Sequence, residues 1–413
     1  MREMKDSGIE WIGDIPVSWK IMPNKYLMRK EKKICPVYHG EDILSLTMKG
    51  VIVRDLDAGG KMPTSFDGYQ RLEAGNLLMC LFDIDVTPRC VGLIKQAGVS
   101  SPAYSQFVLR KGADAAYYCY YYTMLDNDKT LLHLAKNLRH SLTEDQLGAI
   151  PVIVPPTDEQ RCIADFLNTK CAEIDALTAD IQTQIDTLEQ YKRSVITETV
   201  TKGLNPDAEM KDSGIEWVGK MPLAWDAVPN KYLMYKVKNI CPVYNGEDIL
   251  SLTTNGVIIR DLNGGGKMPT SFDGYQKVTP GNLLMCLFDI DVTPRCIGLV
   301  KNFGLTSPAY SQFVMRTGAY APYYYYYYLM VDYTKELLHM AKNLRHSLTE
   351  DQLGAIKAPN PPYEEQVQIA EFLDKKCVEI NLVIEDKNRQ LATLDEYKKS
   401  LIFEYVTGKK EVV

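Results

Sequence analysis

The chain contains two nearly identical copies of one sequence. Residues 3–11 return as residues 209–217, and the register then holds without a gap at a constant offset of 206 residues (209 − 3). Residues 76–90 reappear letter for letter as residues 282–296. A repeat of this length is a duplicated domain, because solenoid units have periods of about 20–50 residues. Two copies of one surface on one chain suit a target that is itself two copies of one thing.

Length and composition exclude several classes of protein. A chain of 413 residues with 46% hydrophobic content has room for about two to four ordinary globular domains. No apolar run approaches a membrane span and the polar start is no signal peptide, so we expect no membrane partner and a cytoplasmic location. The ten cysteines are scattered without CxxC spacing, which argues against structural zinc and against a disulfide framework.

The net charge of −6 is unevenly distributed. Residues 3–150 carry 18 Lys+Arg against 18 Asp+Glu, and residues 209–356 carry 14 against 14. The segments 151–206 and 357–413 carry 5 against 9 and 9 against 11. The larger part of each copy is therefore neutral, and a neutral domain can still present a basic face to DNA.

The first 150 residues or so of each copy are typical of a mixed α and β domain. Short β-prone runs, such as residues 50–54 and 76–82, alternate with clusters of Gly, Pro, Asp and Asn. The prolines Pro155-Pro156 and Pro361-Pro362 then end that pattern.

Beyond the prolines the apolar residues recur at steps of three and four. Nothing from Asp158 to Thr201 breaks a helix, and Gly203 with Pro206 supplies a stop. This spacing over several heptads predicts a long helix with a coiled-coil seam in each copy. About 40 residues at a rise of 1.5 Å make a rod of roughly 60 Å. A lone rod with an apolar stripe would be marginally stable, so we expect the two rods to pack antiparallel.

Two signatures in each copy carry a family resemblance. Residues 5–16 followed by Trp19, and the PP-x-x-EQ-x-x-IA-x-FL pattern of residues 155–167, strongly resemble the specificity subunits of type I restriction–modification systems. Both recur, at residues 211–222 with Trp225 and at residues 361–373. The resemblance covers the whole chain, and four matches in the right order are more specific than any single motif.

The resemblance implies a DNA-reading subunit without catalytic activity of its own. In that family two target-recognition domains, each followed by a conserved helix, read the halves of a bipartite site. The implied partners are double-stranded DNA, two methyltransferase subunits and the restriction/translocase subunits. The implied cofactors are none on this chain, with S-adenosylmethionine, ATP and Mg²⁺ on the partner subunits.

We therefore predict an α+β fold: two near-identical mixed α/β target-recognition domains, each followed by a long helix, the two helices packing as an antiparallel coiled coil with pseudo-two-fold symmetry. The expected segments are domain 1 at residues 1–155, spacer helix 1 at 156–205, domain 2 at 206–361 and spacer helix 2 at 362–413.

The near identity of the two domains departs from the usual family member, whose recognition domains differ widely. We predict a palindromic or nearly palindromic site, with the same short half-site on opposite strands. Antiparallel rods would act as a ruler for the spacer, with domains spaced about one turn of B-DNA apart, roughly 34 Å.

The candidate DNA-contacting residues are donors and amide side chains on predicted loops, because Arg, Lys, Asn, Gln and Ser/Thr read base edges. In the first copy they are Thr64, Ser65, Tyr69, Gln70, Thr87, Arg89, Tyr104, Ser105, Gln106, Lys136, Asn137, Arg139, His140 and Ser141; in the second they are Thr270, Ser271, Tyr275, Gln276, Thr293, Arg295, Tyr310, Ser311, Gln312, Lys342, Asn343, Arg345, His346 and Ser347.

Each candidate has a structural alternative. The first three clusters can be ordinary surface turns, and the fourth can cap the following helix, with Ser141 or Thr143 as N-cap and Glu144 in the first turn. The polar differences between the copies that could make the half-sites unequal are His39/Asn245, Lys49/Asn255, Arg71/Lys277 and Ser100/Thr306.

Two further motifs are typical of other functions. Asn360-Pro361-Pro362-Tyr363 spells the NPPY motif of adenine methyltransferases, but its counterpart is Val154-Pro155-Pro156-Thr157, which lacks the Asn and Tyr. The tyrosine runs at residues 117–122 and 323–328 could stack on bases, although packing in the core is the commoner use. We expect the four tryptophans to be packing residues against the helices. The competing class is a coiled-coil scaffold that binds proteins and no DNA, and salt-dependent binding to duplex DNA separates the two.

Overall fold

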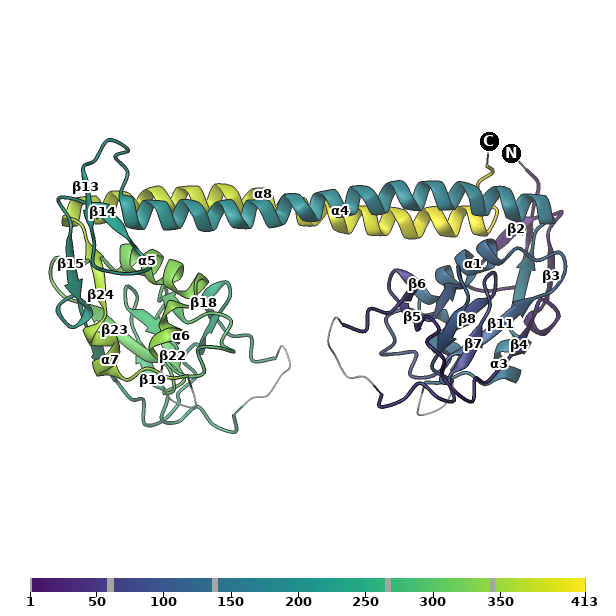
Figure 1. Cartoon of the computed structure of the whole chain (residues 1–413), viewed down its shortest axis with the longest axis horizontal. Coiled ribbons are helices and arrows are strands. Elements are labelled where there is room, and N and C mark those ends of the chain that lie inside the picture. The colour runs from purple at the N-terminus through teal and green to yellow at the C-terminus, as the bar shows by residue number, and fades with distance from the viewer. Residues whose placement is uncertain (1, 58–62, 136–139, 264–268, 342–345, 413) are drawn as a thin grey trace. The chain divides into compact units, whose positions relative to one another are not determined.

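The computed structural model describes residues 2–57, 63–135, 140–263, 269–341 and 346–412 (Figure 1). The chain divides into two compact units: unit 1 is Met1–Ile181 with Asn388–Val413, and unit 2 is Gln182–Lys387. Each unit therefore combines one copy of the repeated domain with part of each long helix. Strands, short helices and long helices follow one another in the order that the sequence indicates, so the α+β class is confirmed.

The domain of unit 1 is built on a four-stranded antiparallel sheet in the order β4-β11-β8-β9. Two-stranded sheets surround it, pairing β1 with β2, β3 with β12, β5 with β6 and β7 with β10. The strands are β1 Met4–Asp6, β2 Asp14–Pro16, β3 Lys20–Pro23, β4 Met28–Glu31, β5 Leu44–Thr47, β6 Gly50–Val53, β7 Gln70–Leu72, β8 Leu77–Met79, β9 Val91–Leu93, β10 Gly98–Ser100, β11 Ser105–Leu109 and β12 Pro151–Val154.

The domain of unit 2 repeats this topology with the sheet order β16-β23-β20-β21. Its strands are β13 Met210–Asp212, β14 Lys220–Pro222, β15 Asp226–Pro229, β16 Met234–Val237, β17 Leu250–Thr253, β18 Gly256–Ile259, β19 Gln276–Val278, β20 Leu283–Met285, β21 Ile297–Leu299, β22 Gly304–Thr306, β23 Ser311–Met315 and β24 Lys357–Asn360. The short helices of the two units are α1 Ala115–Asn127, α2 Thr130–Leu134, α3 Glu144–Ala149, α5 Ala321–Tyr333, α6 Glu336–Met340 and α7 Glu350–Ala355, with 3-10 turns at Asn24–Tyr26 and Asn230–Tyr232.

The long helices are α4, Thr157–Lys202, and α8, Tyr363–Val406. The expected helix from Asp158 to Thr201 is therefore correct to within one residue at each end. In unit 1 the rings of Phe166 and Tyr405 lie 4.3 Å apart, and Asp175 forms an ion pair with Lys398. Contact positions that rise along α4 fall along α8, so the two helix segments of this unit run antiparallel. In unit 2, Lys192 donates to Asn381 at 3.0 Å.

The tyrosine runs lie in the core, as the packing alternative predicts. In unit 1, α1 lies between the sheet and the long helices (Figure 1), and its residues Tyr117, Tyr118, Tyr121 and Tyr122 are fully buried. Their hydroxyls find partners inside the protein, as buried phenols must. Tyr117 donates to the carbonyl of Val406 at 2.8 Å, at the end of α8. Base stacking by these rings is excluded, because they are covered.

The first family signature holds the domain to the long helices. Trp19 is completely buried, and its Nε1 donates to Glu159 in the first turn of α4 at 2.9 Å. Its ring also meets Gly408 just after α8, where an added Cβ would lie 2.8 Å from the ring. A side chain larger than hydrogen has no room there, and the φ of +71° favours glycine as well. The expected packing of tryptophan against the helices is thus confirmed for Trp19.

The second signature contributes a buried glutamine to the same junction. Gln160 accepts from the backbone of Asp114 at 2.8 Å and donates to the carbonyls of Gly112 and Pro155 at 3.1 and 2.8 Å. It is fully buried, so these bonds join the start of α1 to the start of α4 in a dry environment. In the described part of the chain, no helix has both the length and the apolar character that a membrane crossing requires.

Candidate nucleic-acid interface

The structure turns several predicted base-reading side chains inward. Gln70 is buried, and its amide donates to the carbonyls of Ser101 and Tyr104 at 3.0 and 2.8 Å. Gln276 repeats these bonds in unit 2. The prediction that these two glutamines read bases is therefore wrong, because their amides close a loop of their own domain.

Gln106 and Ser105 on β11 are also buried, as is Gln312 on β23. Gln106 accepts from the backbone of Glu73 at 2.8 Å and has no surface left for a ligand. Ser311, the twin of Ser105, is partly exposed. The expectation of base contacts is wrong for the buried members, because residues of a central strand alternate between two covered faces.

Exposed or partly exposed candidates remain in the first cluster of each copy. Thr64, Ser65, Thr270 and Ser271 lie at the surface. The hydroxyl of Ser65 accepts from the backbone of Asp67 at 3.0 Å, which is an ordinary turn contact. Tyr69 and Tyr275 are partly buried and pack edge-on against a phenylalanine, with ring centroids 5.3 Å apart in each copy.

Only part of the fourth cluster, residues 140–141 and 346–347, lies within the described residues. Lys136, Asn137, Arg139, Lys342, Asn343 and Arg345 lie outside the described residues. His140 and His346 are exposed, and their Nδ1 atoms lie 3.1 and 2.9 Å from Asp85 and Asp291. The hydrogen bond from His346 holds the pKa of Asp291 below its usual range.

The capping alternative for this cluster is correct for one of its two candidates. Thr143 is the N-cap of α3, with its side chain accepting from Gln146 and the Gln146 side chain accepting in return from the Thr143 backbone. Glu144 lies in the first turn, as expected. Ser141 and Ser347, the other candidates, are partly exposed.

A hollow of about 450 Å³ lies in the unit 2 domain beside the third predicted cluster. One wall is the turn between β17 and β18 with Thr253 and Thr254, and the other is the loop between β20 and β21 with Phe288 and Val292. Tyr310 lies against both. Burial raises the pKa of Tyr310, so its phenol keeps its proton and can donate a hydrogen bond.

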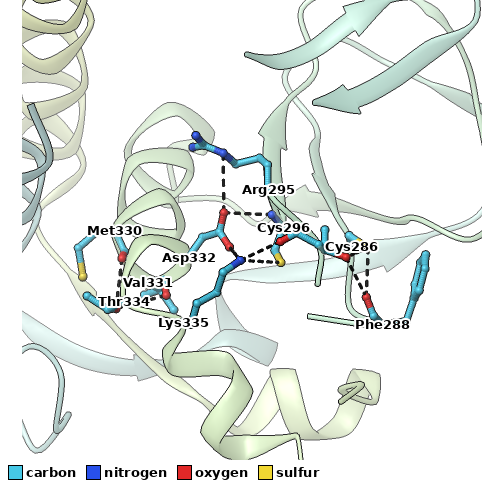
Figure 2. Close-up of polar contacts among 10 residues, drawn as sticks. Cys286, Phe288, Arg295, Cys296, Met330, Val331, Asp332, Thr334 and Lys335 are labelled. Atoms are coloured by element: carbon cyan, nitrogen blue, oxygen red, sulfur yellow. Dashed lines mark hydrogen bonds and ion pairs between the residues drawn. The ribbon is translucent and has the colours of Figure 1, made fainter. Parts of the chain in front are cut away.

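The loop of the hollow is fixed from behind by a buried carboxylate. Figure 2 shows Asp332 on α5 between two cations, with Arg295 at 3.7 Å and Lys335 at 2.9 Å. Asp332 also accepts from the backbone nitrogen of Cys296 at 3.1 Å. Lys335 donates in turn to the carbonyl of Thr293 at 2.9 Å. The carboxylate thus ties the end of the loop to the buried helix.

This arrangement changes the role of Arg89 and Arg295, which were predicted to read bases. Their side chains are only 17% and 16% exposed and face the buried carboxylates Asp126 and Asp332. The hydroxyls of Thr87 and Thr293 also turn inward, toward carbonyls of their own loops. The two arginines and the two threonines therefore position the loop. Their polar groups face the protein, so the prediction that they contact bases is wrong.

The start of the loop is fixed as well. The thiol of Cys286 donates to the carbonyl of Phe288 at 3.4 Å (Figure 2). At the other end, burial raises the pKa of Cys296 to about 12, so this thiol stays protonated. Rigid loops of this kind hold exposed side chains in a fixed direction, which recognition of a ligand requires.

The residues that this loop exposes were missed by sequence reasoning. Val292 and its twin Val86 are both 73% exposed, and Phe82, the twin of Phe288, is 36% exposed. These side chains are apolar, whereas the sequence-based prediction rests on polar donors and amides. The available signal was the identity of residues 76–90 and 282–296, which includes apolar residues on a predicted loop.

A larger cleft, of about 480 Å³, lies in unit 1 between α1, β9 and the long helices. Its wall includes Cys119 and Asn127, whereas the second copy has Tyr325 and Tyr333 at these positions. Because these are much larger side chains, the shape of the cleft is particular to the first copy. A function shared by both copies is better served by the residues that line the hollow, since nine of the ten recur 206 positions earlier. Among the described residues, no group of three or more His, Cys, Asp or Glu is arranged to hold a metal ion.

Comparison with known proteins identifies the class to which this arrangement belongs. The chain is 25% identical over 284 residues to the type I restriction enzyme MjaVIII specificity subunit of Methanocaldococcus jannaschii, covering 64% of this chain and 63% of that protein. It is 25% identical over 293 residues to the putative type I restriction enzyme MjaX specificity subunit of the same organism, covering 66% and 62%. The chain thus matches less than two thirds of the length of either relative. No family model matches the chain.

The fold is shared with a solved chain from a study of complex assembly and conformational transition of the type I R-M system. The TM-score is 0.70 at 12% identity, over 96% of this chain and 99% of that chain. The class is thus that of two-domain proteins with paired long helices. More particularly, the chain is similar in sequence to type I restriction enzyme specificity subunits.

Proposed function

We propose that this chain is the DNA-specificity subunit of a type I restriction–modification complex and reads one half-site with each repeated domain. The observation that carries the proposal is the extent of the sequence match. The 64% of the chain aligned with the MjaVIII subunit is about 264 residues, longer than the 206-residue repeat. The likeness therefore extends into both copies and is not a property of a single domain.

The structure supports a recognition role without catalysis by this chain. The loop beside the hollow and its counterpart in the first copy carry the same exposed valine, Val292 and Val86, and the apparent methyltransferase motif has a structural use. Asn360 accepts from the hydroxyl of Tyr324 at 2.8 Å and from Gln366 at 3.2 Å. Its amide therefore holds the domain to α8 and is not free to bind a flipped adenine.

The partners follow from the same proposal. Two methyltransferase subunits would modify an adenine in each half-site, and the restriction/translocase subunits would act on unmodified DNA. S-adenosylmethionine, ATP and Mg²⁺ would be held by those subunits, which supply the chemistry of methyl transfer and translocation. The contribution of this chain is to bind the two half-sites and orient the assembly on them.

The first prediction concerns binding to duplex DNA. Full-length protein with the modification subunit of its own system should bind a duplex containing its site about 10³-fold or more tightly than a scrambled duplex. The logarithm of the binding constant should fall linearly with the logarithm of salt concentration, because phosphate contacts release counterions. Fluorescence anisotropy at several salt concentrations measures both. Stable binding to the modification subunit with no salt-dependent DNA binding would support the scaffold alternative instead.

A second prediction concerns the sequence of the site. Because the β8–β9 and β20–β21 loops are identical in sequence, from residue 76 to 90 and from 282 to 296, the half-sites should be the same or nearly the same short sequence on opposite strands. The half-sites are expected on opposite strands because the duplication predicts a two-fold relation between the two domains. Single-molecule methylation sequencing of the source genome reports both modified adenines and their flanking bases. Two unrelated half-site sequences would refute this prediction while leaving the specificity function intact.

A further inference from the structure

We propose that the hollow between the β17–β18 turn and the β20–β21 loop, and the corresponding surface residues of the first copy, receive the edge of a thymine base in each half-site. The inference rests on the proposed DNA-reading function and assigns a base to one surface of the domain. The surface is defined by Thr253, Thr254, Phe288, Val292 and Tyr310.

The first argument is the chemistry of the lining. Phe288 and Val292 offer apolar surface, and the hydroxyls of Thr254 and Tyr310 can act as hydrogen-bond donors beside it. The hydroxyl of Thr253 donates to the carbonyl of Gly256 at 3.0 Å and shapes the turn. In the major groove, thymine is the base that presents a methyl group next to an acceptor, O4. Cytosine, guanine and adenine present no methyl group there. A lining with apolar and donor groups side by side therefore matches thymine.

The second argument is the exposure of the loop. A valine that is 73% exposed gains nothing for folding, yet the loop that carries it is held by a buried carboxylate, by a thiol and by a histidine–carboxylate pair. Fixing a loop costs conformational entropy. That cost is explained if Val292 and Val86 must point in one direction to meet a ligand. Apolar contact with the thymine methyl is a known form of base readout.

The third argument comes from the comparison of the two copies. Of the ten residues that line the hollow, all but Thr254 recur unchanged 206 positions earlier. Other exposed positions have changed, including Lys49/Asn255 and Ala97/Phe303. The one difference in the lining is Met48, which is 60% exposed in the first copy. A lining preserved in both copies fits a base that is common to both half-sites, and Met48 with Thr254 is where the two readings can differ.

The test is a scan in which each thymine of the recognised duplex is replaced by uracil, which removes only the 5-methyl group. Binding of the full chain with its modification subunit is measured by fluorescence anisotropy. At one thymine in each half-site the replacement should weaken binding about fourfold, the effect of losing one buried methyl or methylene group. The double variant Val86→Ala/Val292→Ala should bind the thymine and uracil duplexes within about twofold of each other.

A matched control separates this effect from general loss of stability. Val17→Ala truncates another exposed valine, 44% exposed in the turn after β2, and should keep the full sensitivity to uracil. Both sites are exposed, so neither variant should affect folding appreciably. The inference is overturned if no thymine shows sensitivity, if the sensitivity survives in the double variant, or if a half-site contains no thymine. In each of these cases the protein still binds its site, so the proposed function would stand; complete absence of duplex binding would overturn both.

Discussion

Replacing Trp225 with alanine should destabilise unit 2 by about 3–5 kcal/mol, the range for removing a large buried aromatic side chain. Trp225 is completely buried, and its Nε1 donates to Glu365 at the start of α8 at 2.9 Å. Its ring also meets Gly203 at the end of α4, where an added Cβ would lie 3.1 Å from the ring. The truncation would therefore leave a cavity and remove the contact that joins the domain to both helices.

Urea unfolding followed by circular dichroism at 222 nm measures the free energy of unfolding. Hydrogen exchange then shows whether the loss is located in α5 and in the first turns of α8. Trp225→Phe keeps most of the ring and loses the hydrogen bond to Glu365, so it should cost about 1–2 kcal/mol.

The control is Tyr232→Ala, since this aromatic residue of the same unit is 62% exposed. It should change the free energy of unfolding by no more than about 0.5 kcal/mol. Equal losses for Trp225→Ala and Tyr232→Ala would contradict the role of Trp225 at the junction. Trp19→Ala provides a second test in unit 1, because Trp19 makes the same hydrogen bond to Glu159.

The features of the fold that could be predicted are those whose sequence pattern is long or occurs in both copies. The duplication is explicit in the sequence, and the spacing of apolar residues extends over the whole of α4, which has 46 residues. Such periodicity predicts a helix and its ends with little dependence on the rest of the fold. The burial of the tyrosine runs was predictable for a similar reason, because consecutive large rings need a core to cover them.

The candidate site was less predictable because its side chains are directed by partners far away in the sequence. Arg89 looks like a free donor on a loop, yet it faces Asp126, which lies 37 residues later in α1. Gln70 looks equally free until β7 pairs with β10 and brings Ser101 within hydrogen-bonding distance. Neither contact has a local pattern in the sequence. Residue type alone therefore overestimates the number of polar side chains available to a ligand.

The apolar part of the surface was also not predictable from residue type. Val86 and Val292 carry no hydrogen-bonding groups, so only the comparison of the two copies could have singled them out. In a duplicated chain, an exposed residue that is identical in both copies of an unchanged loop is a candidate for contact with a ligand. The same comparison shows that Met48 and Thr254 differ, a pair that a search for polar changes passes over.

Replacing Asp332 with alanine should cost about 2–3 kcal/mol and should also loosen the loop that forms the hollow. Asp332 is 6% exposed, and its removal would leave the backbone nitrogen of Cys296 without an acceptor and two cations without a counter-charge. The expected cost lies below the ~3–5 kcal/mol for a fully buried pair, because the side chain of Lys335 is 33% exposed and keeps contact with water. Specific binding should weaken roughly tenfold, since the loop is no longer held in one direction.

Two further variants show which property of Asp332 matters. Asp332→Asn keeps an acceptor for Cys296 and loses the charge, so it should cost about half as much as the alanine variant. Glu336→Thr introduces the residue that the first copy has at this position, Thr130, and should leave stability and binding within experimental error. Unfolding in urea and anisotropy titrations against specific and scrambled duplexes measure the two effects separately. If Asp332→Ala lowers stability while the ratio of specific to non-specific binding stays unchanged, the carboxylate stabilises the domain without positioning the loop for DNA.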